Sequence, residues 1–98
     1  MIEIYRDTAE KVTFKLYVGG VRANSSTAVT VKVTAVDGTV ITASSPAAVE
    51  TVSGIESYSY IIPLSATVKE RDLDVEWHYT AASQAGIKID RVTVVTPY

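Results

Sequence analysis

The stretch of sequence that decides the fold reads Leu73-Asp74-Val75-Glu76-Trp77-His78-Tyr79-Thr80. Apolar and polar residues alternate along it without a break. Because successive side chains of a β-strand point to opposite faces of a sheet, this alternation predicts a strand with one dry face and one wet face. The side chains predicted to face the core are Leu73, Val75, Trp77 and Tyr79.

The same two-residue period recurs along most of the chain. It predicts further strands at residues 12–18, 29–35, 39–43, 48–53 and 57–64. Threonine and valine, which favour a pleated and half-buried surface, are common in these runs. No segment shows the 3.6-residue period of a helix, and residues 46–50 could hold one helical turn at most.

Glycine and proline mark the expected turns. Gly19-Gly20 suits the positive φ of a tight turn, and Asp37-Gly38 between two β-rich runs is a strong hairpin signal. Ser44-Ser45-Pro46 is predicted to break the strand pattern, because proline has no backbone N–H to donate. Residues 69–72 and 82–86 are predicted turns on either side of the opening stretch.

The last run, residues 86–96, carries an irregularity. Ile87 and Ile89 share one parity, whereas Val92 and Val94 have the other. A β-bulge near Asp90-Arg91 would allow all four side chains to face the core. The alternative is a strand that is buried on both faces.

Seven or eight short strands separated by turn signals predict one all-β domain over residues 1–98, built as a two-sheet antiparallel β-sandwich. A chain of 98 residues fits one compact domain, because two domains would each be too small to bury a core.

The composition argues against several classes of partner. The net charge is −2, with acids and bases interspersed, so no basic stripe for nucleic acid is present and an anionic membrane is not expected. No apolar run is long enough for a membrane span, and the first residues lack the pattern of a signal peptide. The absence of cysteine excludes disulfides, thiolate zinc sites and cysteine nucleophiles. We expect a protein made in the cytosol.

His78 is the only histidine, and the alternation places it on the wet face. Base catalysis needs a nucleophile or an orienting partner, and no motif supplies one. No glycine-rich phosphate loop or nucleophile elbow occurs. We therefore predict no enzyme, no catalytic residue and no cofactor, and we do not expect a small-molecule ligand.

Two groups of acidic residues are candidate cation sites. Asp72, Asp74 and Glu76 form a row on one strand face, but neighbours in such a row lie roughly 7 Å apart, and calcium ligands usually come from loops. A solvated face that limits edge pairing is the favoured interpretation. Residues 7–10 are interpreted as an Asx-type turn between strands, so no metal site is predicted.

Aromatic side chains are the remaining candidates for recognition. Tyr58, Tyr60, Trp77 and Tyr79 share parity with core positions and are predicted to pack in the core. Tyr5, Tyr17 and Tyr98 have weaker claims to burial. If they cluster outside, they would form an interface patch.

The order of the segments along the chain resembles that of a known family. Residues 4–14 come first, followed by a Val-x-Val-x-Val strand and Asp37-Gly38-Thr39-Val40. Gly54 then precedes residues 58–63, and residues 73–80 and the ending 92–98 complete the order. Over the whole chain this order resembles immunoglobulin-like or fibronectin-III-like modules of tailed-phage virion proteins. The chain departs from antibody-type domains, because it lacks the cysteine pair, an early-strand tryptophan and a tyrosine corner.

The resemblance implies an immunoglobulin-like sandwich that is a non-enzymatic structural module located in the virion. Its partners would be other virion proteins or copies of itself, bound through edges and loops. The ending Pro97-Tyr98, directly after a strand, is interpreted as the end of an N-terminal module of a longer protein. The alternative is a surface or carbohydrate-binding adhesion module of a phage or bacterial protein, which would use the loops at one end of the sandwich.

Overall fold

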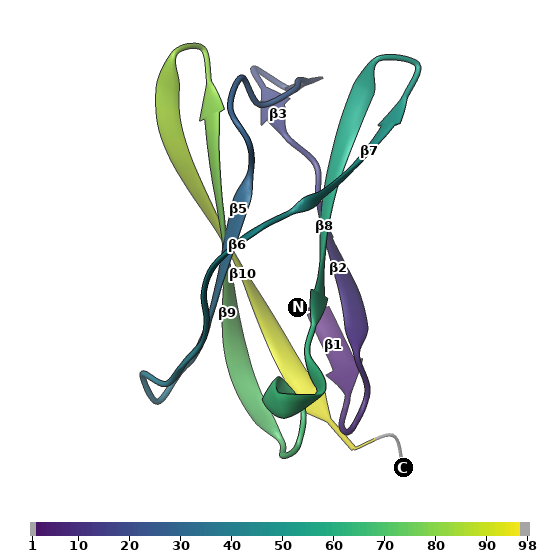
Figure 1. Ribbon diagram of the computed structural model, residues 1–98, viewed down its shortest axis with the longest axis vertical. Helices are drawn as coiled ribbons and strands as arrows, with labels where there is room; N and C mark the ends of the chain where they lie inside the picture. The colour runs from purple at the N-terminus through teal and green to yellow at the C-terminus, as the bar shows by residue number, and fades with distance from the viewer. Residues whose placement is uncertain (1, 97–98) are drawn as a thin grey trace.

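The computed structural model describes residues 2–96, and Figure 1 shows their arrangement. These residues form ten strands and one short 3-10 helix, η1 (Leu64–Ala66). The strands are β1 (Ile2–Tyr5), β2 (Glu10–Phe14), β3 (Tyr17–Val18), β4 (Val21–Arg22), β5 (Thr30–Ala35), β6 (Val40–Pro46), β7 (Ala48–Val52), β8 (Ile55–Ile62), β9 (Arg71–Ala81) and β10 (Gln84–Val95). The all-β prediction is confirmed. The strand count exceeds the expected seven or eight, partly because the run at residues 12–18 is divided between β2 and β3.

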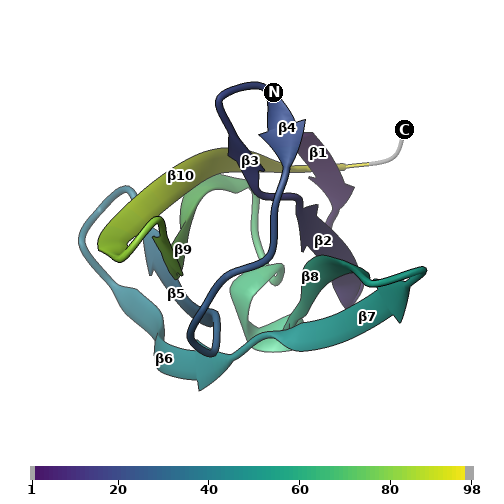
Figure 2. The ribbon, with the colours of Figure 1, turned by 90° about the horizontal axis from the view of Figure 1, so that it is seen from above.

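Two main sheets enclose the core (Figure 2). One has the strand order β1-β10-β9-β5-β6, the other has the order β2-β8-β7, and β3 and β4 form a separate small hairpin. Neighbouring strands are antiparallel except β1 and β10, which run parallel. The arrangement is compatible with the predicted β-sandwich, with the correction that the larger sheet is mixed. Within residues 2–96 no helix has the length and apolar character needed to cross a membrane.

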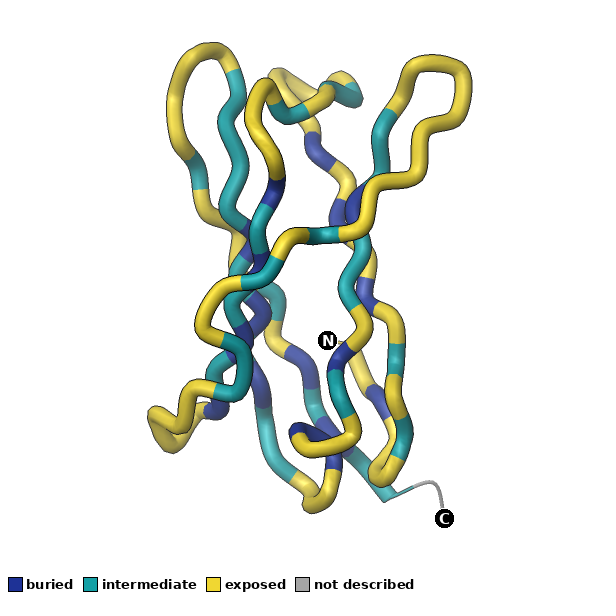
Figure 3. Tube along the Cα trace, viewed as in Figure 1, coloured by how far each residue is buried: buried dark blue, intermediate teal, exposed yellow. Residues whose placement is uncertain are grey.

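The central strands β5 and β9 supply the rows that alternation predicts. Val31, Val33, Leu73, Val75 and Trp77 are all 0% exposed. Figure 3 shows buried positions along the facing strands, whereas the tips of the β7–β8 and β9–β10 hairpins are exposed. The buried rows of the smaller sheet lie on β2 and β8, whereas β7 is exposed at all of its residues, and the hairpin tips project beyond the core.

Phe14 of β2 is the centre of an aromatic cluster that joins the sheets. Its ring centroid lies 5.8 Å from that of Tyr58, 5.5 Å from that of Trp77 and 5.5 Å from that of Tyr79. Trp77 and Tyr58 are buried, while Tyr79 and Tyr60 pack against the core with part of their surface exposed. The predicted burial of these aromatic residues is thus confirmed, completely for two of them and partly for the others.

The expected break at Ser44-Ser45-Pro46 is confirmed only in part. β6 continues through Pro46, which lies opposite Thr30, and ends there, but its register with β5 shifts between the pairs Val31–Ser45 and Val33–Thr42. β6 is the outermost strand of its sheet, so a proline there can leave its donor-free side unpaired. The predicted turns at residues 69–72 and 82–86 are shorter than expected, because β9 begins at Arg71 and β10 at Gln84. The glycine turn signals are confirmed. Gly19-Gly20 joins β3 to β4 with both φ values positive, and Asp37-Gly38 lies in the β5–β6 hairpin.

The predicted β-bulge in the last run is wrong. β10 pairs with β9 in an unbroken register from Gln84 opposite Ala81 to Val94 opposite Arg71. Val92 and Val94 are therefore buried, whereas Ile87 is 57% exposed and Ile89 59% exposed. Burial of the strand on both faces is excluded by the same exposures.

Charged residues explain why the regular register is stable. The inward positions of upper β10 are held by Lys88 and Asp90, next to the aromatic cluster. Lys88 Nζ lies 5.4 Å from the centroid of the Phe14 ring, and Trp77 Nε1 donates a 3.1 Å hydrogen bond to Asp90 Oδ2. The two charged side chains cover one end of the core, which leaves the isoleucines on the outside.

Candidate functional site

Outward side chains of β10, β9 and β5 form rows across the larger sheet. From the tip of the β9–β10 hairpin downward, the register gives the rows Ile87–His78–Thr30, Ile89–Glu76–Lys32 and Arg91–Asp74–Thr34. We call the first two rows the isoleucine face. This face combines two largely exposed isoleucines with charged neighbours.

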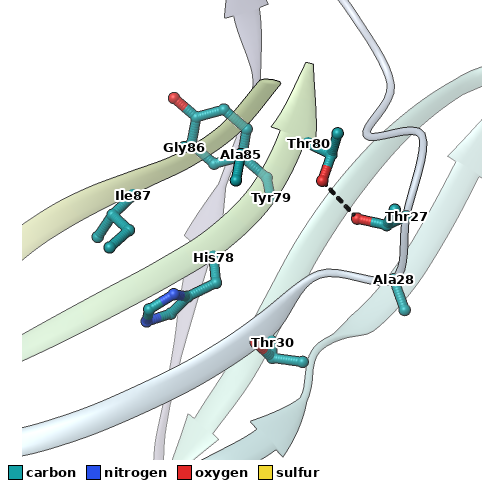
Figure 4. Close-up of a pocket in the computed structure, with 9 residues that line it drawn as sticks. All are labelled: Thr27, Ala28, Thr30, His78, Tyr79, Thr80, Ala85, Gly86 and Ile87. Carbon is teal, nitrogen blue, oxygen red and sulfur yellow. Dashed lines mark hydrogen bonds between the residues drawn. The ribbon is translucent and has the colours of Figure 1, made fainter. Parts of the chain in front are cut away.

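A hollow of about 510 Å³ lies at the upper end of the isoleucine face, where β9, β10 and the loop before β5 meet (Figure 4). Thr27 and Thr80 line it, and Thr27 Oγ1 donates a 2.9 Å hydrogen bond to Thr80 Oγ1. The backbone N–H of Ser26 donates to the Thr80 carbonyl, and the Thr80 N–H donates to Ser25 Oγ. These bonds hold the loop against the end of β9, so they shape one wall of the hollow.

His78 lies on the outward face of β9, as predicted, and lines the hollow. Its Nε2 is 3.7 Å from Glu76 Oε1, beyond hydrogen-bonding distance, and both side chains are partly exposed. Thr30 and Ile87 are its neighbours across the sheet. The Glu76 carboxylate is therefore the acidic group that the structure places beside the imidazole.

The acidic row on β9 is occupied by basic and hydroxyl partners. Arg91 Nε donates a 2.6 Å hydrogen bond to Asp74 Oδ1, and Thr93 Oγ1 donates a 2.8 Å bond to Asp72 Oδ1. The Asp74 carboxylate raises the pKa of the Arg91 guanidinium. Over residues 2–96, no group of three or more acidic or histidine side chains converges as a metal site. The expectation that this row limits edge pairing is wrong, because β9 lies between β10 and β5.

The second acidic candidate is a turn between β1 and β2, as predicted, but hydroxyl groups hold it. Thr8 Oγ1 donates to the Tyr5 carbonyl at 2.6 Å. The buried Thr67 donates through Oγ1 to the Thr8 carbonyl at 2.8 Å. Asp7 has a φ of 60°, and its N–H donates to the Thr67 carbonyl. This segment therefore forms a turn that hydrogen bonds to Thr67, directly after η1.

The exposed tyrosines do not form one patch. Tyr5 is 51% exposed and Tyr17 is 56% exposed, but their strands, β1 and β3, lie toward opposite ends of the molecule (Figure 1). Tyr98 lies outside the described residues. Tyr5 and Tyr17 therefore do not form the interface patch that the sequence suggested.

The feature that sequence reasoning missed is a half-open strand edge. Among residues 2–96, β1 pairs with residues 92–95 of β10, and residues 84–91 have β9 as their one partner strand. Gln84, Ala85, Ile87, Lys88 and Ile89 on this edge are all exposed. The break in parity between Ile89 and Val92 was the available signal, because a regular strand turns one of those two sets outward.

Comparison with family models, with curated proteins and with solved structures gives no match to this chain.

Proposed function

We propose that this chain is a non-enzymatic β-sandwich module that acts through protein–protein contacts. The observation that carries the proposal is the pair of exposed isoleucines beside the half-open edge of β10. Natural sheet proteins usually protect open edges with charges, proline or a covering segment. An edge flanked by Ile87 and Ile89 offers both backbone hydrogen-bonding groups and apolar surface, which suits the addition of another strand.

The finer proposal is that the sandwich is immunoglobulin-like. In that fold, strands A, B, E and D form one sheet and strands C, F and G form the other. If β2, β5, β7, β8, β9 and β10 are taken as B to G in chain order, the sheets β2-β8-β7 and β5-β9-β10 have the same grouping. This correspondence supports the immunoglobulin-like assignment, with β3, β4 and β6 as additions. β1 departs from the place of strand A, because it pairs with β10 and not with the β2-β8-β7 sheet.

The proposed setting is a tailed-phage virion, where the partners are other virion proteins or further copies of this chain. The sequence resemblance supports this setting, and strand edges supply the contacts. Mass spectrometry of gradient-purified virions tests it. Trypsin should release residues 72–88 as one peptide, because Arg71 and Lys88 are consecutive cleavage sites. We expect the chain to co-purify with the particles through the gradient, so that this peptide is detected after digestion of the particle fractions. Its absence from digests of intact virions would overturn the proposal.

A second candidate is a surface or carbohydrate-binding adhesion module, which the hollow at the end of the isoleucine face favours. The hollow offers the His78 imidazole and threonine hydroxyls beside Ile87. A glycan array probed with the wild-type chain and with His78→Ala tests it. Binding that the substitution weakens supports the adhesion function. A wild-type chain that binds no glycan at millimolar concentration excludes it.

A further inference from the structure

The open part of the β10 edge has a well-defined length. It runs from Gln84, where β10 begins, to Arg91, since Ile2 of β1 lies opposite the next residue, Val92. Along this segment the first three outward positions, Ala85, Ile87 and Ile89, are apolar, and the fourth is Arg91. The inward positions are Gln84, Gly86, Lys88 and Asp90. The segment is therefore a two-faced strand with one free side.

We propose that this edge pairs with the same edge of a second copy, antiparallel and about a twofold axis at Ile87. This inference rests on the proposed function and names the partner as another copy of the chain. In this register, residues 84–90 of each copy pair with residues 90–84 of the other. Ile87 meets the partner's Ile87, and each Ile89 meets the partner's Ala85. The large and small side chains then fit together in one apolar stripe on the outer face.

The neighbouring symmetric registers are less favourable for identifiable reasons. An axis at Lys88 would place the two ammonium groups directly opposite each other, which destabilises a strand pair. An axis at Ile89 would bring the partner's Gly86 to Val92, where Ile2 already lies. An axis at Gly86 would place Ile89 opposite the turn residue Ser83 and shorten the pairing. The register at Ile87 pairs every residue of the free segment except Arg91 and places Lys88 opposite the partner's Gly86.

The interface is small. One strand pair with its outward apolar stripe buries less than the roughly 1,200 Å² typical of stable complexes, so we expect a weak dimer that forms at high local concentration. Such a concentration is available when many copies are held on one particle. Weak pairing of identical edges would thus reinforce an assembly that other contacts initiate.

Cysteine cross-linking tests the register directly, because the chain has no cysteine of its own. In Ile87→Cys, residues facing each other across the axis have Cα atoms roughly 4.5–5.5 Å apart, within the range that a disulfide spans. With oxidised glutathione as the oxidant, we expect the Ile87→Cys chain to form covalent dimers at least about tenfold faster than chance collision allows.

Two matched variants complete the experiment. Ile89→Cys lies on the same face but would be several residues out of register with its copy, and Ile61→Cys replaces an isoleucine on β8 of the other sheet that is 61% exposed. We expect both to cross-link at the collision rate. Faster cross-linking of Ile89→Cys than of Ile87→Cys would overturn the register. Equal cross-linking rates for all three variants would overturn self-pairing. This result is also expected if the edge binds a strand of a different protein.

Failure of this inference can be distinguished from failure of the proposed function. If the chain is present in virions but Ile87→Cys cross-links no faster than Ile61→Cys, only the self-pairing is wrong. If Ile87→Cys dimers form but the chain is absent from virions, only the virion setting is wrong. Concentration-dependent NMR shifts confined to residues 84–90 of the wild-type chain would support the same edge without any substitution.

Discussion

Phe14 should be the most costly aromatic residue to replace, because three rings and one ammonium group contact it. We choose Phe14→Leu, which keeps an apolar side chain of similar size but removes every aromatic contact. The substitution therefore separates ring stacking from simple apolar burial at a position that is 2% exposed.

The expected magnitude follows from the contacts. Aromatic pairs contribute about 0.5–1.5 kcal/mol each beyond their buried area, and Phe14 makes three, with Tyr58, Trp77 and Tyr79. The three pairs share one ring and are not additive, so we expect a loss of about 2 kcal/mol in the free energy of unfolding. For a domain of this size, such a loss lowers the melting temperature by about 8–16 °C.

Urea unfolding followed by the fluorescence of Trp77, the only tryptophan, measures the loss. The midpoint should fall while the slope stays unchanged, because both chains expose similar surface on unfolding. Tyr17→Leu is the matched control, since this aromatic residue is mostly exposed and its replacement should change stability by less than about 0.5 kcal/mol. A Phe14→Leu loss no larger than that of the control would refute the argument that the aromatic cluster holds the two sheets together.

Three further expectations follow from single contacts. Gly86→Ala would place a Cβ 2.5 Å from Cζ of Tyr79, so the ring must shift, and calorimetry should show a loss of about 1–3 kcal/mol. Asp90→Ala should cost a similar amount, about 1–3 kcal/mol in urea unfolding, because it leaves the buried Trp77 indole N–H unpaired, whereas Asp90→Asn keeps an acceptor and should cost less. Burial raises the pKa of Tyr58 above its ordinary 10.0, so the folded state holds this proton more tightly than the unfolded state. Its contribution to stability is therefore complete below pH 10 and is lost as the pH rises above it, and denaturation curves of Tyr58→Phe should show a weaker decline in that range.

Sequence alternation predicts the inner strands well for a physical reason. β5 and β9 each have neighbours on both sides, so one face is dry along the whole strand and period two is strict. The outer strands follow weaker rules. Pro46 is accommodated because β6 is an edge strand, and alternation does not reveal which strands lie at edges.

The candidate site was predictable only in part. The outward position of His78 follows from its parity with Glu76, and the structure confirms it. The open edge does not follow from local sequence, because it depends on how far β1 extends along β10. The predicted burial of Ile87 and Ile89 is wrong because the hydrophobicity of its residues does not by itself orient a strand.

The orientation of β10 links the stability of the core to the surface that we propose as an interface. Lys88 and Asp90 face inward, where they contact the rings of Phe14 and Trp77, and strict alternation then places Ile87 and Ile89 outward. Slipping the strand by one residue would bury the isoleucines but would also remove the acceptor from the Trp77 indole and turn Val92 and Val94 to solvent. The exposed isoleucines are thus a consequence of how the aromatic cluster is covered. Between Gln84 and Arg91 the outer edge of the same strand has no partner strand within residues 2–96, so the exposed isoleucines lie beside free backbone donors and acceptors. Strand pairing between copies requires this combination.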